Sequence, residues 1–166
     1  MAKGDDDDVD IVIDAWANAL PDVDFAPLDV VSRLRRLVPH LQEVRRLSFA
    51  ASNLRPWEFE FLSILRQHGA DGLTPSMLAT RLGITSGNLA SQLDRLAARS
   101  LVARQKNEAD GRSKIVVLTT LGQQRVDEAM RRLVDDEKAM LAGLSHEQVA
   151  VLIESLRVIG AALERR

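Results

Sequence analysis

Cysteine and tyrosine are absent from this 166-residue chain, and aromatic residues make up only 4% of it. The lack of cysteine excludes a disulfide framework, a thiolate metal site and thiol-based redox sensing. Long apolar runs are also lacking, because none approaches the roughly 20 residues that a membrane-spanning helix needs. The N-terminal sequence MAKGDDDD is acidic, whereas a secretory signal peptide is basic and then apolar. We therefore expect a cytoplasmic protein.

Motifs for catalysis and for metal or cofactor binding are lacking as well. The three histidines, His40, His68 and His146, are scattered without the spacing of metal ligands. There is no phosphate-binding glycine loop and no pairing of a nucleophile with a base. The sequence therefore predicts a protein that is not an enzyme, uses no metal or cofactor and carries its histidines on the surface.

What the chain does have is the composition of a globular, mainly helical domain, with 46% apolar and 28% charged residues. Its net charge of −2 is unevenly distributed. Residues 1–30 contain one lysine against nine aspartates, whereas residues 74–114 contain seven basic residues against three acids. Because binding responds to local potential, the basic segment suits a polyanionic partner, although many solvated faces are as basic.

Apolar residues recur at helical spacing in the N-terminal part of the chain. This spacing predicts a helix over residues 9–20 and a second helix from Pro27, which suits a first turn. Pro39 falls inside the second pattern and should kink the helix or lie at a break. A third helix should begin near Pro56 and end at Gly69. Its core face should consist of Trp57, Phe61, Leu62 and Leu65.

Two short helices and a hairpin are predicted for the middle of the chain. Thr74-Pro75 forms a cap and a first turn, Gly83 closes the first short helix, and the second covers residues 86–99. Alternating residues at 101–106 and 115–118 predict the hairpin. The side chains expected to face inward are Met77, Leu78, Leu82, Leu89, Leu93 and Leu96. Helix, tight turn, helix and two-stranded ribbon make a winged helix-turn-helix.

Two further helices are predicted at the C-terminal end. One covers about residues 120–141, and the last begins at a capping-box-like sequence, Ser145 to Gln148. The fold class is therefore mainly α with a small β-hairpin wing.

The second short helix has small polar residues on its outward side. These residues are Ser86, Asn88, Ser91, Gln92 and Arg95, and Ser76 stands at the start of the helix before it. The N-terminal end of such a helix enters a major groove, where Asn and Gln pair with adenine edges and Ser reaches bases or phosphates. The alternative is an ordinary solvated helix face.

The tip of the predicted hairpin has charged turn residues. They are Asp110, Gly111, Arg112, Ser113 and Lys114. Gly111 allows a tight turn, and Arg112 is suited to a minor groove, where the negative potential attracts it. Asp110 can hold the Arg112 guanidinium in position when DNA is absent. The alternative is a turn that only adds solubility.

With these residues in place, the chain resembles the MarR family of transcriptional regulators. The resembling segments are LTPSMLATRLGIT, LDRLAARSLVAR and DGRSKIVVLTTLG, within about residues 54–130. One departure is Ser100, where the family has glycine; a left-handed turn there would cost serine roughly 1 kcal/mol. The resemblance implies a homodimer joined through its N- and C-terminal helices, which binds double-stranded DNA at a palindromic operator.

The resemblance also implies how the chain is divided. Residues 1–8 would form an acidic disordered end and residues 9–53 the N-terminal helices for dimerisation and a ligand site. Residues 54–119 would form the winged helix-turn-helix DNA-binding domain, and residues 120–166 the C-terminal dimerisation helices. The implied function is a sequence-specific transcriptional regulator, a repressor released by a small aromatic or anionic effector. The alternative is a helical protein-interaction scaffold without DNA binding, which has no use for a basic wing.

The added N-terminal helix resembles the urate-responsive, HucR- and PecS-like branch of that family. The branch carries a Trp, an Asp and two Arg at its ligand site, and the matching positions here are Trp16, Glu58, Gln92 and Arg104. Glu58 and Gln92 depart from the branch's Asp and Arg. Trp16 offers a flat surface for an aromatic ligand, and Arg104 offers a bidentate partner for an anion. The alternatives are dimer-interface packing for Trp16, and pairing of Arg104 with Glu58 or a phosphate.

Overall fold

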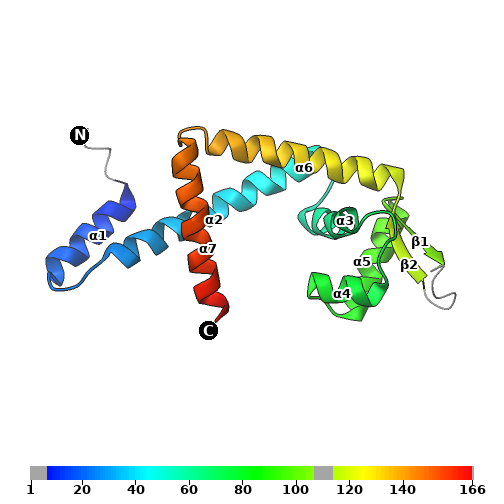
Figure 1. Cartoon of the computed structure of the whole chain (residues 1–166), viewed down its shortest axis with the longest axis horizontal. Helices are drawn as coiled ribbons and strands as arrows, with labels where there is room; N and C mark the ends of the chain where they lie inside the picture. The colour runs from blue at the N-terminus through cyan, green and yellow to red at the C-terminus, as the bar shows by residue number, and fades with distance from the viewer. Residues whose placement is uncertain (1–6, 107–113, 166) are drawn as a thin grey trace. The chain divides into compact units, whose positions relative to one another are not determined.

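A computed structural model of the chain describes residues 7–106 and 114–165 (Figure 1). Its internal contacts divide it into two compact units, Met1–Val44 and Arg45–Arg166. Helix α2 (Ala26–Ala51) begins in the first unit and ends in the second. None of the helices in the described residues is long and apolar enough to span a bilayer.

The first unit begins with α1 (Asp8–Ala19), for which Asp7 is the N-cap. The Asp7 carboxylate accepts hydrogen bonds from the backbone N–H groups of Val9 and Asp10. In turn the Asp10 carboxylate accepts the Asp7 N–H, which completes a capping box. Asp7 and Asp8, which the sequence placed in an acidic disordered end, belong to the start of this helix, and residues 1–6 lie outside the described residues. Carboxylates at this position are stabilised by the exposed N–H groups and the helix dipole.

An arginine on α2 connects these acids to the second helix. The Arg33 guanidinium donates to Asp7, Asp10 and Asp29 at 2.5–2.7 Å, and Arg36 pairs with Asp8 at 3.0 Å. Desolvation is the largest single influence on the pKa of Asp7 and raises it. Hydrogen bonds from the backbone of Asp10 and Val9 and the charge of Arg33 together outweigh it, so this pKa is lowered overall. The pKa of Arg33 is raised by the hydrogen bond to Asp29 and by its acidic neighbours.

At the other end of α1, Trp16 stacks on Phe25, with ring centroids 6.4 Å apart.

Pro39 lies inside α2, and the helix continues through it. The break that was one of the two expected outcomes therefore does not occur, and a kink at Pro39 stays a prediction. A proline in a helix interior removes one hydrogen bond to the preceding turn, and the strong helix formers on both sides of Pro39, Leu and Arg above all, favour continuation.

The second unit contains the predicted winged helix-turn-helix. Its elements are α3 (Pro56–His68), α4 (Pro75–Leu82), α5 (Ser86–Ala98), β1 (Val102–Lys106), β2 (Lys114–Leu118), α6 (Thr120–Met140) and α7 (His146–Glu164). The two strands are antiparallel, with Val102 opposite Leu118 and Arg104 opposite Val116. Backbone hydrogen bonds between Leu73 and Val116, at 2.8 and 3.0 Å, add one further bridge to the hairpin. All these elements were predicted from the sequence, and Ser145 forms the predicted capping box of α7.

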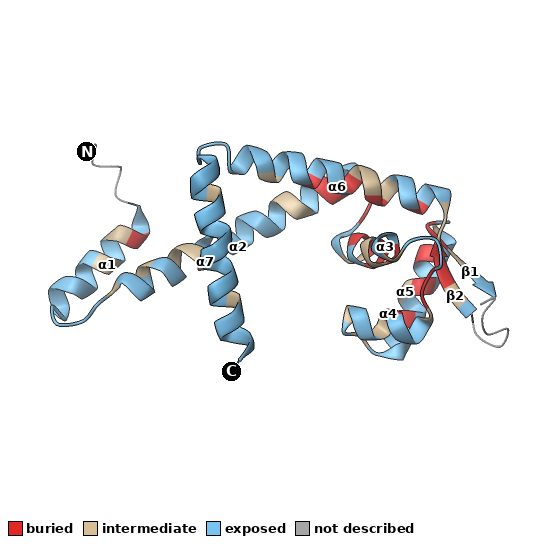
Figure 2. Ribbon diagram, viewed as in Figure 1, coloured by how far each residue is buried: buried red, intermediate tan, exposed pale blue. Residues whose placement is uncertain are grey.

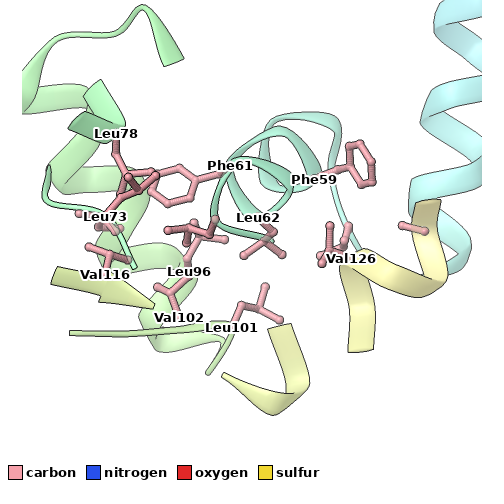
Figure 3. Close-up of a cluster of buried hydrophobic side chains, with 14 of the residues drawn as sticks. Phe59, Phe61, Leu62, Leu73, Leu78, Leu96, Leu101, Val102, Val116 and Val126 are labelled. Atoms are coloured by element: carbon pink, nitrogen blue, oxygen red, sulfur yellow. The ribbon is translucent and has the colours of Figure 1, made fainter. Parts of the chain in front are cut away.

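The core lies where α3, α5, α6 and the hairpin meet (Figures 2 and 3). Phe61, Leu62 and Leu65 are buried as predicted, whereas Trp57 is half-buried at the edge of the core. In α4 only Leu78 is fully buried. Met77 is 44% exposed, so its predicted inward position is wrong. One residue advances about 100° around a helix, so Leu78 and Met77 cannot face the same narrow core.

Helix α7 is apolar but buries none of its residues in the single chain. Its exposed apolar side chains are Val151, Leu152, Ile153, Leu156, Val158, Ile159 and Leu163. Apolar side chains of the α2 segment in the first unit are exposed too, including Leu28, Val31 and Leu37. Such extensive exposed apolar surface is unusual for a monomer.

Candidate nucleic-acid interface

Local chemistry determines how α4 and α5 are joined. Thr74 caps α4 by accepting the Met77 N–H, and Thr85 caps α5 by accepting the Asn88 N–H, both at 3.4 Å. Between the two helices, Gly83 adopts a left-handed conformation with φ of 64°, which glycine adopts without strain. The result is a tight turn that places α5 directly after α4.

The buried and exposed sides of α5 follow the predicted pattern with one exception. Leu89, Leu93 and Leu96 are buried. Of the predicted DNA-contacting residues, Ser76, Ser86, Asn88, Ser91 and Arg95 are exposed. Gln92 is half-buried, because it lies three residues after Leu89, on the flank of the buried stripe.

The hairpin places cationic side chains beside α4 and α5. Residues directly opposite each other in antiparallel strands point to the same side, so Arg104 and the Lys106–Lys114 pair share a face with buried Val102 and Val116. The core-facing side of the hairpin therefore becomes cationic toward its tip. Lys114 is the exposed first residue of β2, whereas Asp110 and Arg112 lie outside the described residues.

A cleft of about 330 Å³ separates the hairpin from α4 and α5. Its polar lining consists of Ser76, Ser86, Arg104 and Lys114. Arg104 also reaches Asp94 on α5, with 2.7 Å between Nη2 and Oδ1. Arg104 thus pairs with Asp94 rather than with Glu58, and sequence reasoning had assigned Asp94 no role.

Glu58 lies at the start of α3 and is only 2% exposed. Its carboxylate accepts the Arg55 N–H at 2.8 Å and the Arg99 guanidinium at 2.5 and 2.6 Å. Arg99 also donates to the backbone carbonyl of Asn53 at 2.6 Å. The end of α5 is therefore tied to the junction of α2 and α3. Sequence reasoning missed Arg99, because no local pattern relates it to a residue 41 positions earlier.

A second cleft, of about 630 Å³, surrounds this ion pair. Its lining includes Trp57, Arg55, Arg95 and Arg99. Of the four predicted ligand residues, Glu58 lines this cleft, Arg104 lines the other and half-buried Gln92 lines neither. The fourth, Trp16, stacks on Phe25. The described residues contain no group of three or more His, Asp or Glu that could hold a metal ion.

The connection from α5 to the wing has the left-handed turn expected at Ser100, whose φ is 54°. The Thr119 hydroxyl donates to the Ser100 carbonyl at 2.6 Å, and the Thr119 N–H donates to Leu101 at 3.2 Å. Thr119 also caps α6. Thr119 therefore links the end of α5, the base of the hairpin and the start of α6.

Comparison with known proteins agrees with this geometry. Residues 52–113 match the MarR family. The HTH-type transcriptional regulator PecS of Dickeya dadantii (strain 3937) is 30% identical over 142 residues, covering 85% of this chain and 86% of PecS. The solved structure of the transcriptional repressor CouR bound to a 23-mer DNA duplex is similar as well. The alignment covers 84% of this chain and 99% of the CouR chain, with 25% identity and a TM-score of 0.65. For the structure of wild-type MarR from E. coli in its apo form, the alignment covers 77% of this chain and 95% of the MarR chain, with 25% identity and a TM-score of 0.62.

Proposed function

Because this chain belongs to the MarR family of transcriptional regulators, we propose that it is a homodimeric repressor that binds a palindromic DNA operator. A small aromatic or anionic effector would release it. The single observation that best supports DNA binding is that hydroxyl side chains of α4 and α5 and cationic side chains of the hairpin line one cleft. These side chains suit the phosphates of a duplex, with α5 in the major groove and the wing beside it.

Each proposed contact follows from chemistry and exposure. Asn88 would pair with a base edge, and Ser86, Ser91 and Ser76 would reach bases or phosphates. Arg95 and Lys114 would neutralise phosphates, and Gln92 would contribute from the flank of α5. From the sequence motif, Arg112 would enter the minor groove and Asp110 would position it.

The homodimer would cover the apolar surface that the single chain exposes. The exposed side chains of α7 and of α2, such as Leu156 and Val31, would be buried against a second copy. We propose the division of labour expected from the sequence: residues 9–53 and 120–166 form the dimer, and residues 54–119 bind DNA.

Selection from a random duplex pool tests the proposed function. We expect enrichment of a palindrome whose half-sites lie about 10 base pairs apart, centre to centre. Binding should weaken steeply as salt increases, because phosphate contacts release counterions. A helical scaffold without DNA binding would enrich no sequence and would show no salt-sensitive binding.

Asn88→Ala should relax base preference at one position in each half-site. A bidentate base contact is worth about 1–3 kcal/mol, so affinity for the best operator should fall by roughly 10-fold or more. Competition binding with operators that differ at single positions would measure this effect. Gln124→Ala, on an exposed position of α6, is the matched control and should leave the preference unchanged. An Asn88→Ala protein with unaltered preference at every position would contradict the assignment.

For the effector, we propose the cleft around Glu58 and Arg99. Trp57 offers an aromatic face there, and an effector anion would compete with Glu58 for the Arg99 guanidinium. Because Arg99 directly follows α5, this exchange would shift the recognition helix and weaken DNA binding. The alternative aromatic contact is Trp16, which the sequence indicates.

The two tryptophans distinguish these sites. Trp57→Phe and Trp16→Phe each keep an aromatic ring but leave one fluorophore, since the chain contains only two tryptophans. Titration with urate or benzoate should quench the fluorescence of Trp16→Phe and leave that of Trp57→Phe unaffected. Arg99→Gln should weaken effector binding by roughly 10-fold or more, since a hydrogen bond to a charged group is worth about 1.5–3 kcal/mol. Quenching only in Trp57→Phe would place the effector at Trp16 instead.

A further inference from the structure

The helix-turn-helix and the first strand of the hairpin contain one acid in an otherwise basic stretch. Between Thr74 and Lys106 the sequence has five basic residues, and Asp94 is its single carboxylate. The Asp94 side chain is 69% exposed and pairs with Arg104 at 2.7 Å. A negative charge here repels phosphates, so its presence on the recognition helix needs an explanation.

Asp94 lies on the side of α5 that faces the hairpin. Ser86 and Ala90, which precede it by eight and four residues, line the cleft between α5 and the hairpin, and residues four apart share a helix face. Arg104 lines the same cleft and reaches out of it to Asp94. Together with Lys114 and the hydroxyls of Ser76 and Ser86, Arg104 would give this cleft the cations and donors that a DNA phosphate requires.

We propose that Asp94 is a specificity-determining residue, which neutralises Arg104 until a phosphate of correctly bound DNA enters this cleft. The proposal rests on the DNA-binding function proposed above. Because the ion pair is largely exposed, it is weak, and a phosphate in the cleft can take over the guanidinium. Once α5 lies in the major groove, Arg104 therefore exchanges the Asp94 carboxylate for a DNA phosphate with little loss of free energy.

This exchange would act differently on specific and non-specific DNA. Non-specific binding depends on electrostatic attraction alone, and a cation already paired with a carboxylate contributes little to it. In the operator complex the base contacts of α5 hold a phosphate at the cleft, so that Arg104 contributes fully. Asp94 thus lowers affinity for random DNA more than affinity for the operator.

The test is a double-mutant cycle with Asp94→Asn and Arg104→Gln. Fluorescence anisotropy would measure affinity for random duplex and for the selected operator between about 50 and 200 mM salt. Asp94→Asn should raise affinity for random duplex about 2- to 5-fold and steepen its log-affinity versus log-salt slope by about one unit. Affinity for the operator should rise less, so that the ratio between the two falls. The gain should disappear in the double mutant, because it requires the Arg104 guanidinium.

Asp127→Asn is the matched control. It removes an acid that also pairs with an arginine, Arg66, at 2.8 Å, but on α6, and it should leave both affinities unchanged. Asp94→Ala is a second variant that removes the same charge, and thermal unfolding would verify that each variant is folded. A gain that persists with Arg104→Gln, or that is equal on both DNAs, would overturn the role of Asp94 while leaving the DNA-binding function intact. A wild-type chain without salt-sensitive DNA binding would overturn both.

Discussion

Gly122→Ala is expected to destabilise the DNA-binding part of the chain by about 3 kcal/mol, at the upper end of what overpacking costs. A Cβ atom on Gly122 would lie 2.0 Å from the carbonyl oxygen of Leu101 and 2.9 Å from its carbonyl carbon. These are backbone atoms of a residue that is 2% exposed, and the same oxygen accepts the Thr119 N–H. Relief of the clash would therefore require α6 to move away from the base of the hairpin. A loss of this size is a large fraction of the 5–15 kcal/mol that stabilises a typical domain.

Urea unfolding followed by circular dichroism would measure this loss. Gly87→Ala is the matched control, because Gly87 also lies in the first turn of a helix but has no atom near the position of a new Cβ. It should stabilise the fold slightly, since alanine loses less backbone entropy in a helix than glycine does. If the two variants were equally stable, the close approach of α6 to Leu101 would be wrong.

Leu156→Glu combined with Ile159→Glu is expected to abolish the proposed homodimer. The two side chains lie on α7, which buries nothing within its own chain, and a two-fold axis would place both substitutions in the interface twice. If each subunit lost about 3 kcal/mol of apolar burial, the dissociation constant of the dimer would rise by roughly four powers of ten. Operator binding should fall with it, because a monomer occupies one half-site only.

Analytical ultracentrifugation would follow the dimer, and operator titration would follow DNA binding. Arg157→Glu is the control: it places the same acid on a highly exposed position of α7, where Arg157 pairs with Glu154 of the same helix. This control should remain dimeric. A double Glu variant that also remained dimeric, with unchanged operator affinity, would exclude α7 from the interface.

The elements that the sequence predicted correctly are those governed by short-range chemistry. A proline at the start and a glycine after the end define α3, and α4 has the same two signals with a threonine cap. A threonine or serine cap marks the start of α5 and of α7. The hairpin follows from alternation and from turn residues. Even the left-handed Ser100 could be anticipated, because the family pattern places a glycine there.

Predictions failed where two neighbouring positions competed for one packing surface. Met77 and Leu78 are both apolar, and only the position of α4 relative to the core decides that Leu78 is the buried one. Gln92 belongs by type to the polar side of α5, yet the packing of that helix leaves it half-buried. Pro39 is a separate case, because the sequence predicted either a kink or a break there, and the continuous helix excludes only the break.

By itself, the sequence determined the winged helix-turn-helix and its family, because periodicity, caps and turns act over a few residues. Only the tertiary structure decided how the charged groups pair. Glu58 binds Arg99, 41 residues away, and Arg104 binds Asp94 instead of Glu58. The physical reason is that an ion pair forms between whichever opposite charges packing brings within about 4 Å, and packing of separate elements leaves no trace in local sequence. The same holds for Gly122, where a missing side chain has meaning only because α6 passes directly over the backbone of Leu101.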